Sequence, residues 1–599
     1  MNVEIIPRWN VKNIFPSIDS NEYTGSLNIL LRKISDCEVL FKQLDLTNLD
    51  LAQKTKFCAA GINALNDIYE LGGMMNAYLH SFITTDSRDE VAARKNSEFE
   101  KIYLQIQNLH LNFQVWVGKA SDTEIEAMIK ANQICADHAF NLRTLKDQAR
   151  YLMTTDLEVL ANELALSGTQ AWNKLQGAVT SQLSVPFEVD GVTKDYPMPA
   201  LINFRSHPQE DVRRRAYETE MQAWKSVEVP LAMALNGVKG TTVTLNNRRG
   251  RTDAVHSSID MARIERKTLE VMLASMVNSL PTFHKYFLKK ADRIGKKQLD
   301  WWDLFAPDSS TTQTFTWSQT KDFILTHFGS FSPELSNFAR RAFEENWIDA
   351  EQRDGKRGGA FCMGIPGKKE SRILCNFDGS LDQVGTIAHE LGHAFHNECA
   401  YQANKTEFQQ DTPMTLAETA SIMCETIVVE ALLKETKDQS SLLAILGNNL
   451  VGESQVIVDI YSRYLFESEI FKKRESAELS ANEINDTMLA AQKAAYGNAI
   501  HPDHFNKYAW TWKPHYYYSG LSFYNFPYAF GLLFAKGLYE IYKQRGSEFI
   551  ADYKHLLAST GEASAEVLAS RFNIDIQSRI FWDGSLKNIA NEIELYNSL

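Results

Sequence analysis

The chain has 599 residues but only 30 glycines and 15 prolines, so residues that break helices are scarce and long helices are favoured. This composition argues against collagen-like, disordered and turn-rich all-β proteins. Hydrophobic residues make up 44% of the chain and charged residues 23%, the balance of an ordinary soluble protein, and the net charge of −13 makes nucleic acid and anionic membranes poor partners.

The seven cysteines are widely spaced and form no CxxC pair. Neither a disulfide framework nor a thiolate metal site is therefore expected. The N-terminal segment MNVEIIPRWNVKNIF lacks the basic and apolar regions of a signal peptide, and no window of about 18 uninterrupted apolar residues predicts a membrane span. We expect a soluble, cytoplasmic protein.

Successive amphipathic helices are predicted for the N-terminal third. Apolar residues between Leu27 and Phe41 recur with the spacing of one helix face, and similar patterns fill residues 50–80, 86–118 and 122–139. The spacing of the apolar residues changes near Val185, from the helical pattern to alternation on both sides of Asp190-Gly191. This pattern predicts a β-hairpin.

A domain boundary is predicted next to this hairpin, near residue 200, which gives domains 1–200 and 201–599. Helical patterns resume at residues 209–225 and 266–293, and we expect Pro281 to break the second helix. The polar residues 307–314 predict a loop.

A glycine-rich stretch, Gly358–Ile365, comes before a Pro366-Gly367 turn and a strand at Arg372–Phe377. The stretch lacks the spacing of a phosphate-binding loop, so we interpret it as part of a small antiparallel sheet. A free strand edge here would bind a peptide through its backbone, which makes Gly358, Gly359, Ala360 and Phe361 candidate substrate-binding residues.

The segment HELGH is an HExxH motif formed by His389, Glu390 and His393. In a helix the two histidines lie one turn apart on the same face, so both imidazoles can reach one zinc ion at about 2.0–2.1 Å. The glutamate then projects toward a metal-bound water as a general base. His396 lies about 10 Å along the axis from His389, so we interpret it as a residue that supports the metal ligands or packs the helix, and not as a ligand itself.

A catalytic zinc site needs a third protein ligand, and five downstream acids are candidates: Glu398, Glu407, Asp411, Glu418 and Glu425. Thr412-Pro413 predicts the start of a new helix, with Thr412 as N-cap, that could return Glu418 to His393. In a rival interpretation, Thr415 and Glu418 form a capping box. Glu425 shares the face of Glu418 and is predicted to support a histidine ligand.

The segment DGSLDQVGTIAHELGHAFH, followed by LAETASIMCE, resembles family M3 of the zinc metallopeptidases, in particular the oligoendopeptidase F branch. The stretches GGAFCMGIPG, NFDGS and DLFAP are also similar to that family. Its metal-binding glutamate lies 25 residues after the second histidine, and Glu418 matches that position.

The resemblance implies a mainly α, zincin-like (gluzincin) fold with a small sheet near the active site and a deep substrate channel between helical domains. It also implies an N-terminal domain of the oligoendopeptidase F type and a catalytic domain at 201–599. One Zn²⁺ per chain would be held by His389, His393 and Glu418.

The aromatic segment His515–Gly531 contains Gly520, Ser522, Asn525 and Pro527, which predict a loop before a helix at 531–542. In the family, a histidine and tyrosines of such a loop donate hydrogen bonds to the scissile carbonyl. His515 matches the histidine, and Tyr524 and Tyr528 match best among the tyrosines, with Tyr517 as a substitute.

These residues together predict a zinc-dependent endopeptidase that hydrolyses short unstructured peptides, with Glu390 as general base. Two alternatives stay open: a dipeptidyl carboxypeptidase on the same fold, and a non-enzymatic peptide-binding protein. We expect a monomer whose partners are peptides, not nucleic acid or membrane.

Overall fold

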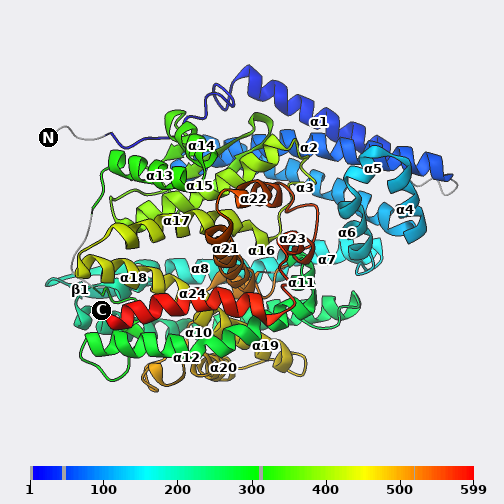
Figure 1. The fold of residues 1–599 in the computed structure, drawn as a ribbon. Coiled ribbons are helices and arrows are strands. Elements are labelled where there is room, and N and C mark those ends of the chain that lie inside the picture. Colours follow the sequence, from blue (N-terminus) through cyan, green and yellow to red (C-terminus); the bar gives the residue numbers. More distant parts are fainter. Residues whose placement is uncertain (1–4, 43–48, 309–313, 519) are drawn as a thin grey trace. The chain divides into compact units, whose positions relative to one another are not determined.

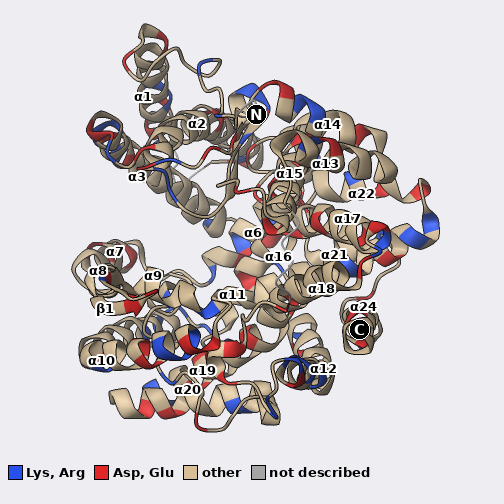
Figure 2. Ribbon diagram, turned by 90° about the vertical axis from the view of Figure 1, so that its left-hand side faces the viewer, with Lys and Arg blue, Asp and Glu red and all other residues tan. Residues whose placement is uncertain are grey.

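The computed structural model describes residues 5–42, 49–308, 314–518 and 520–599. Helices make up most of these residues, and the two small sheets are short (Figure 1). The mainly α fold class predicted from the sequence is therefore confirmed. Segments of Lys and Arg and segments of Asp and Glu are scattered over many of the helices (Figure 2).

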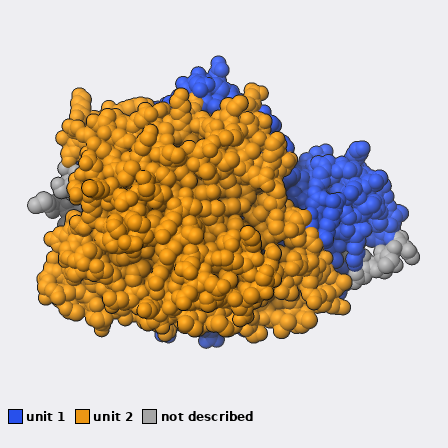
Figure 3. Space-filling view, turned by 90° about the horizontal axis from the view of Figure 1, so that it is seen from below, with its two compact units in different colours: residues 1–151, 313–431, 541–572 blue, residues 152–312, 432–540, 573–599 orange. Residues whose placement is uncertain are grey.

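The chain divides into two compact units, each built from three separate segments (Figure 3). Unit 1 contains residues 1–151, 313–431 and 541–572, and unit 2 contains residues 152–312, 432–540 and 573–599. Each unit groups segments that lie together in space but are far apart in the sequence. The predicted boundary near residue 200 instead cuts the sequence into two consecutive parts, and it stays a prediction.

Unit 1 begins with six helices whose buried faces form one hydrophobic core. Leu30, Leu65, Ile106 and Phe113 lie in this core with other residues of the first helices. Most of the predicted helical stretches are present, although Asn132 caps a short separate helix inside the range 122–139. The elements are α1 (Asn21–Lys42), α2 (Leu51–Thr85), α3 (Glu90–Lys119), α4 (Asp122–Ala131), α5 (Gln133–Asp137) and α6 (Ala139–Ala149).

The rest of unit 1 combines helices with a three-stranded sheet. The helices are α13 (Trp317–Phe331), α14 (Pro333–Glu344), α15 (Leu381–Gln402), α16 (Met414–Ala417), α22 (Glu548–Ala558) and α23 (Ala565–Ser570), together with most of α17 (Thr419–Glu435). The strands are β3 (Ile348–Asp349), β4 (Phe361–Ile365) and β5 (Glu370–Leu374).

The sheet of unit 1 has the strand order β3-β5-β4. β5 pairs antiparallel with β4 and parallel with β3, and a short turn, Pro366–Lys368, joins β4 to β5. The predicted antiparallel pair around Pro366-Gly367 is confirmed, although its second strand begins and ends earlier than residues 372–377. β4 is an edge strand, since no described strand pairs with its other side.

Unit 2 is a second helical body with a two-stranded hairpin. Its elements are α7 (Thr155–Ser167), α8 (Thr169–Gln182), β1 (Ser184–Val189), β2 (Val192–Pro197), α9 (Met198–Asn203), α10 (Glu210–Arg248), α11 (His256–Ala262), α12 (Arg266–Arg293), α18 (Gln439–Ser454), η5 (Gln455–Asp459), α19 (Ile460–Arg474), α20 (Ala481–Tyr496), η7 (Pro514–Tyr517), α24 (Arg579–Ser598) and most of α21 (Phe526–Arg545).

The hairpin predicted around Asp190-Gly191 is confirmed. β1 and β2 pair antiparallel up to Val189 and Val192, and the two residues between them have φ angles of 54° and 76°. Positive φ at both central positions is the geometry of the tightest hairpin turns, which Asp-Gly adopts readily.

The predicted break at Pro281 is wrong, because α12 continues through this residue. A proline inside a helix removes one backbone hydrogen bond and costs about 3 kcal/mol. Leu280, Phe283 and Phe287 are buried around it, and their packing offsets this cost. The predicted loop at 307–314 falls mostly on residues 309–313, which lie outside the described residues.

One helical run in unit 2, Gln439–Arg474, is long and apolar enough to cross a membrane by length and composition alone. About half of its most apolar window, 44%, is buried inside the protein. The run contains the buried acids Glu453, Asp459 and Glu467. Core helices can meet the same criterion of length and composition.

Candidate active site

The HExxH motif lies in the middle of helix α15. Ser380 caps this helix by accepting a hydrogen bond from the Gln383 N–H at 3.3 Å, so the helix begins one residue later. The rings of His389 and His393 lie side by side, with centroids 4.9 Å apart. The helical placement predicted from the spacing is confirmed.

Gly392, between the two histidines, lets α15 approach the following helices closely. A Cβ at this position would lie 2.5 Å from the carbonyl oxygen of Ala420 and 2.6 Å from the Cα of Ser421. Both are backbone atoms that cannot rotate away. The motif therefore requires glycine here, a constraint that the HExxH pattern does not predict.

Glu418 lies at the junction between α16 and α17, at the point where α15 and α17 come close. The Glu418 Oε2 atom is 3.3 Å from His389 Nε2 and 3.4 Å from His393 Nε2. All three candidate ligand atoms lie within 4.8 Å of one another. The structure thus brings together the three residues that the sequence singled out.

The helix start predicted at Thr412-Pro413 is only partly correct. The N-cap of α16 is Pro413, and the Thr412 hydroxyl instead hydrogen-bonds to Thr560 at 2.7 Å. Glu418 ends α16 and its carboxylate accepts a hydrogen bond from the Ser421 hydroxyl at 2.7 Å. Thr415 lies inside α16 rather than at its N-cap, the position that a capping box with Glu418 would require.

Glu425, one helical turn further along α17 from Ser421, contacts the ring nitrogen of His389 that does not face Glu418. The His389 Nδ1 atom donates to Glu425 Oε2 at 3.2 Å, which leaves Nε2 directed at Glu418. Burial lowers the pKa of His389, but the hydrogen bonds to Glu418 and Glu425 outweigh it and raise the pKa to about 10. Such an excess of negative charge around two imidazoles favours a bound cation.

Glu390 points into the same region and is almost fully buried, with 6% of its surface exposed. Burial raises its carboxyl pKa, while His389 and His393 act in the opposite direction. Its Oε2 atom has no hydrogen-bond partner among the described residues. A water molecule bound to zinc would donate a hydrogen bond to this buried carboxylate oxygen. Two histidines and a glutamate are a common ligand set of catalytic zinc, so these residues fit a zinc ion.

His396 is a packing residue of the helix and does not join the ligands. Its Nε2 atom hydrogen-bonds to the Thr560 hydroxyl at 2.9 Å, and burial lowers its pKa to about 4. Glu398 is turned toward Arg341, 3.5 Å away. Glu407 and Asp411 line a separate pocket of unit 1.

The glycine-rich stretch ends at the edge strand β4. Gly358, Gly359 and Ala360 precede this strand, and Phe361 is its first residue. Gly359 has a φ of 79°, and its carbonyl accepts a hydrogen bond from Asn376 Nδ2 at 2.9 Å. β4 and β5 pack on α15, so this edge belongs to the same unit as the histidines.

His515, Tyr524 and Tyr528 gather in unit 2. The rings of His515 and Tyr524 stack at 4.4 Å, and the Tyr524 and Tyr528 hydroxyls are hydrogen-bonded at 2.8 Å. Burial, with Arg463 and Lys513 nearby, lowers the pKa of His515 to about 4, so the imidazole is neutral at pH 7. Tyr517 is not part of this group, because it lies fully buried in a hydrophobic core.

Asp459 was not singled out in the sequence, yet it connects both segments of this aromatic group. Its carboxylate accepts hydrogen bonds from Lys513 Nζ at 3.1 Å and from Arg463 Nε at 2.7 Å. Arg463 in turn donates to the Asn525 side chain at 3.1 Å. Lys513 is two residues before His515, and Asn525 follows Tyr524, so one buried acid fixes both segments.

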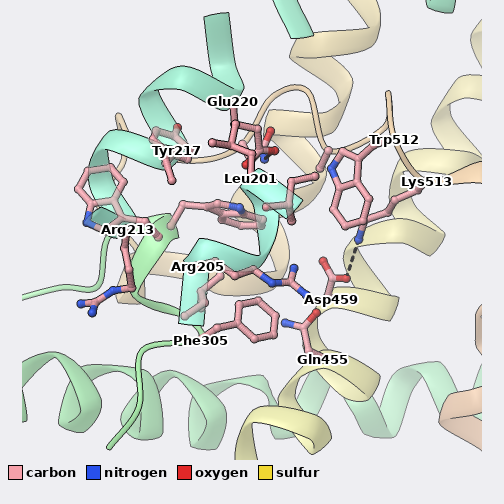
Figure 4. Close-up of a pocket in the computed structure, with 17 residues that line it drawn as sticks. Leu201, Arg205, Arg213, Tyr217, Glu220, Phe305, Gln455, Asp459, Trp512 and Lys513 are labelled. Atoms are coloured by element: carbon pink, nitrogen blue, oxygen red, sulfur yellow. Dashed lines mark hydrogen bonds and ion pairs between the residues drawn. The ribbon is translucent and has the colours of Figure 1, made fainter. Parts of the chain in front are cut away.

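Asp459 and Lys513 also line a small cavity in unit 2 (Figure 4). Its volume of about 40 Å³ has room for roughly three water molecules. Ligand pockets are roughly ten times larger. This cavity is therefore too small for a peptide side chain of ordinary size.

Asp300, His501 and His504 form a second group of possible metal ligands, also in unit 2. The Asp300 carboxylate accepts hydrogen bonds from Lys296 Nζ at 2.6 Å and from the His504 ring. The Lys296 ammonium already compensates this carboxylate, so the group has the features of an ion-pair network.

Taken together, the fold and the HExxH helix with its downstream glutamate define the class of helical metallopeptidases. The family model for peptidase family M3 matches residues 203–587, and the oligopeptidase F model matches residues 117–184. The chain therefore belongs to peptidase family M3.

Curated relatives carry oligopeptidase names. Group B oligopeptidase PepB of Streptococcus agalactiae is 28% identical over 396 residues, which cover 64% of this chain and 64% of the relative. Oligopeptidase PepF of Bacillus subtilis is 21% identical, over 95% of this chain and 84% of the relative. The match thus spans slightly less than two thirds of the streptococcal relative's length.

Solved structures show the same fold along nearly the whole chain. A putative peptidase from Chlamydophila abortus superposes with a TM-score of 0.81 at 17% identity, covering 99% of this chain and 98% of that one. Oligoendopeptidase-F from Enterococcus faecium has a TM-score of 0.70 at 16% identity, covering 96% and 99%.

Proposed function

We propose that this chain is a zinc-dependent endopeptidase that hydrolyses internal bonds of short, unstructured peptides. The observation that supports it most strongly is the convergence of His389, His393 and Glu418 within 4.8 Å, beside the buried carboxylate of Glu390. His389, His393 and Glu418 would hold the metal. A bound zinc ion would polarise the scissile carbonyl and make a water molecule acidic enough to be activated at neutral pH.

Glu390 would act as the general base. Its buried carboxylate accepts the proton of the attacking water and later donates that proton to the leaving amine. The raised pKa of this carboxyl suits both roles, because a group poised nearer to neutral pH both accepts and returns a proton. Glu425 would orient His389 through the Nδ1 hydrogen bond.

His515, Tyr524 and Tyr528 are proposed as the donors that stabilise the oxyanion of the tetrahedral intermediate. A neutral imidazole and phenol hydroxyls are hydrogen-bond donors that need no net charge. The carbonyl and N–H groups at the edge of β4, next to Gly358–Phe361, would bind the peptide backbone by strand addition. Backbone recognition of this kind tolerates many sequences.

Two other functions compete with the endopeptidase. A dipeptidyl carboxypeptidase would require a group that holds the substrate's terminal carboxylate, and a binding protein would not require the base Glu390. We further propose one zinc ion per chain, a monomeric state and a cytoplasmic location.

The proposal is tested with one internal sequence in four forms: free, N-acetylated, C-amidated and embedded in a stable folded domain. An endopeptidase with an enclosed channel cuts the first three at the same bond and at similar rates, and leaves the folded domain intact. Loss of cleavage on C-amidation alone would favour the carboxypeptidase. Ready cleavage of the folded domain would contradict the enclosed channel.

A variant separates catalysis from metal binding. Glu390→Gln should retain zinc but lose several decades of kcat, since it removes the base without removing a ligand. Near-normal turnover of this variant would contradict the proposed mechanism, and normal zinc content without turnover in the parent protein would favour the peptide-binding alternative.

A further inference from the structure

Unit 1 contains a pocket of about 640 Å³ that the mechanism above does not use. Its volume is in the range of roughly 300–1,000 Å³ typical of ligand pockets. Helices α2 and α3, which lie side by side (Figures 1 and 2), form one part of its wall, and the segment between α15 and α16 forms the other. The wall consists of Tyr69, Gly72, Gly73, Tyr103, Ile106, Gln107, His110, Glu407, Phe408, Gln410 and Asp411.

The wall combines aromatic rings with carboxylates. Tyr69, Tyr103 and Phe408 contribute rings, Glu407 and Asp411 contribute carboxylates, and none of the described lining residues is Lys or Arg. The rings are held in place, since Tyr69 packs edge-on against Phe408 at 5.5 Å and its hydroxyl hydrogen-bonds to the His110 ring at 2.6 Å.

Glu407 is a pocket carboxylate that no described cation contacts. Among the described residues it forms no ion pair, and its carboxylate accepts a 3.4 Å hydrogen bond from Gln410 Nε2. The adjacent cation, Lys405, is instead paired with Glu562 at 2.6 Å. Burial and the nearby Glu70 raise the pKa of Glu407 to about 7.

We propose that this acidic pocket binds a basic side chain, Lys or Arg, of the peptide substrate. A carboxylate forms strong charge-assisted hydrogen bonds with an ammonium or guanidinium group, and aromatic faces attract the same cations. The pocket also offers an apolar wall for the methylene stem of such a side chain. This assignment rests on the peptidase function proposed above and adds a preference among substrates.

The chain connection limits how far the basic residue lies from the cleaved bond. Glu407 is eleven residues before the proposed ligand Glu418. At about 3.3–3.6 Å per extended residue, their Cα atoms are at most about 40 Å apart. A peptide bound in extended form would therefore place its basic residue within about twelve residues of the scissile bond.

The test compares peptides that differ only at one residue, Lys or the isosteric norleucine, placed at successive distances from a common cleavage site. We expect the parent protein to favour Lys at one distance by about 10–100-fold in kcat/KM, mostly through KM. Glu407→Gln should bring the ratio of kcat/KM for the Lys and norleucine peptides close to one. Glu100→Gln, which removes an exposed carboxylate of α3 outside the pocket, should keep the preference for Lys.

Equal kcat/KM for both peptides at every distance would overturn the acidic pocket while leaving the peptidase function intact. N-acetylation could lower kcat/KM as much as the replacement of Lys does. That result would assign the pocket to the α-amino group of the peptide and overturn the side-chain assignment. Calorimetric titration of both peptides into Glu390→Gln measures the preference without hydrolysis. Tighter binding of the Lys peptide there supports the pocket even if the parent protein cleaves neither peptide, and equal binding overturns it.

Discussion

Gly392 brings helix α15 into backbone contact with Ala420, whose carbonyl oxygen would lie 2.5 Å from a Cβ at position 392. This contact places the chain so that Glu418, two residues before Ala420, reaches both histidines of the HExxH motif. The position of a proposed ligand therefore depends on a residue that has no side chain.

We predict that Gly392→Ala separates α15 from α17 and weakens zinc binding. Forcing a methyl group into this contact should also lower the free energy of unfolding by about 1–3 kcal/mol. Zinc titration and urea unfolding measure the two effects. Gly385→Ala on the same helix is the matched control, because a Cβ there meets nothing within 4 Å and Ala favours a helix. Similar zinc affinity in the two variants would contradict the role of Gly392.

The proposed ligands and their neighbours should differ in their effects on zinc affinity. Glu418→Ala removes a ligand and should weaken zinc binding most. Glu425→Ala frees the Nδ1 side of His389, and losses of that kind are typically 10–100-fold. His396→Ala should change zinc affinity least and stability more, because His396 packs against Thr560. Parent-like zinc affinity in Glu418→Ala would remove Glu418 from the ligand set.

Local patterns in the sequence predicted a large part of this arrangement. HExxH fixes the relative position of two imidazoles whenever the segment is helical, and Asp190-Gly191 fixes a turn that needs positive φ at both residues. Glu418 was one of five candidate acids by spacing alone. The helix predicted to start at Thr412-Pro413 favoured Glu418 over the other acids, the resemblance to a known family agreed, and the packing of α17 on α15 brings its carboxylate to both histidines.

The features that the sequence did not predict depend on tertiary packing. Pro281 does not end its helix, because buried residues on both sides outweigh the lost hydrogen bond. Thr412 does not cap α16, because its hydroxyl binds Thr560, which is distant in sequence. Asp459 belongs to a run of apolar character, and its partner Lys513 is 54 residues away, so no spacing rule relates them.

The second prediction about positioning concerns Asp459, drawn with Lys513 in Figure 4. Asp459→Asn leaves the buried Lys513 and the partly exposed Arg463 without their anion, and removing one partner of a buried ion pair costs about 3–5 kcal/mol. Urea unfolding should detect the change. Asp438→Asn, at the exposed N-cap of α18, is the control and should be nearly neutral, since Asn caps helices as well as Asp does. Equal stability of both variants would show that the buried network contributes little.

The proposed oxyanion donors should act on turnover more than on substrate binding. His515→Ala and Tyr528→Phe are expected to lower kcat by about 10²–10³-fold with little change in KM, because these donors strengthen mainly in the transition state. Tyr517→Phe is the control. Its hydroxyl is buried without a partner among the described residues, so its removal should leave kcat unchanged. If both variants are less stable but their folded fraction has a normal kcat, His515 and Tyr528 contribute only to packing.

The acidic pocket predicts a cost in stability that appears as the pH rises. Glu407 has its pKa raised from 4.5 to about 7 by burial and by Glu70, with Asp411 and His110 also lining the pocket. Below pH 4.5 the group is protonated in both the folded and the unfolded chain and costs nothing. Between pH 4.5 and 7 the unfolded chain releases the proton first, so stability falls across this window and stays low above it.

Glu407→Gln should therefore leave the free energy of unfolding unchanged at pH 4 and raise it at pH 8. The full shift corresponds to roughly 3 kcal/mol, and partial exposure of the side chain reduces the expected gain to about 1–2 kcal/mol. Glu100→Gln should show no such pH-dependent gain, because its carboxylate is exposed. If Glu407→Gln is both more stable and less selective for Lys, the Glu407 carboxylate destabilises the folded protein but contributes to binding of the peptide. A loss of stability at pH 8 would instead mean that Glu407 is compensated within the folded protein, and that no peptide cation is needed to neutralise it.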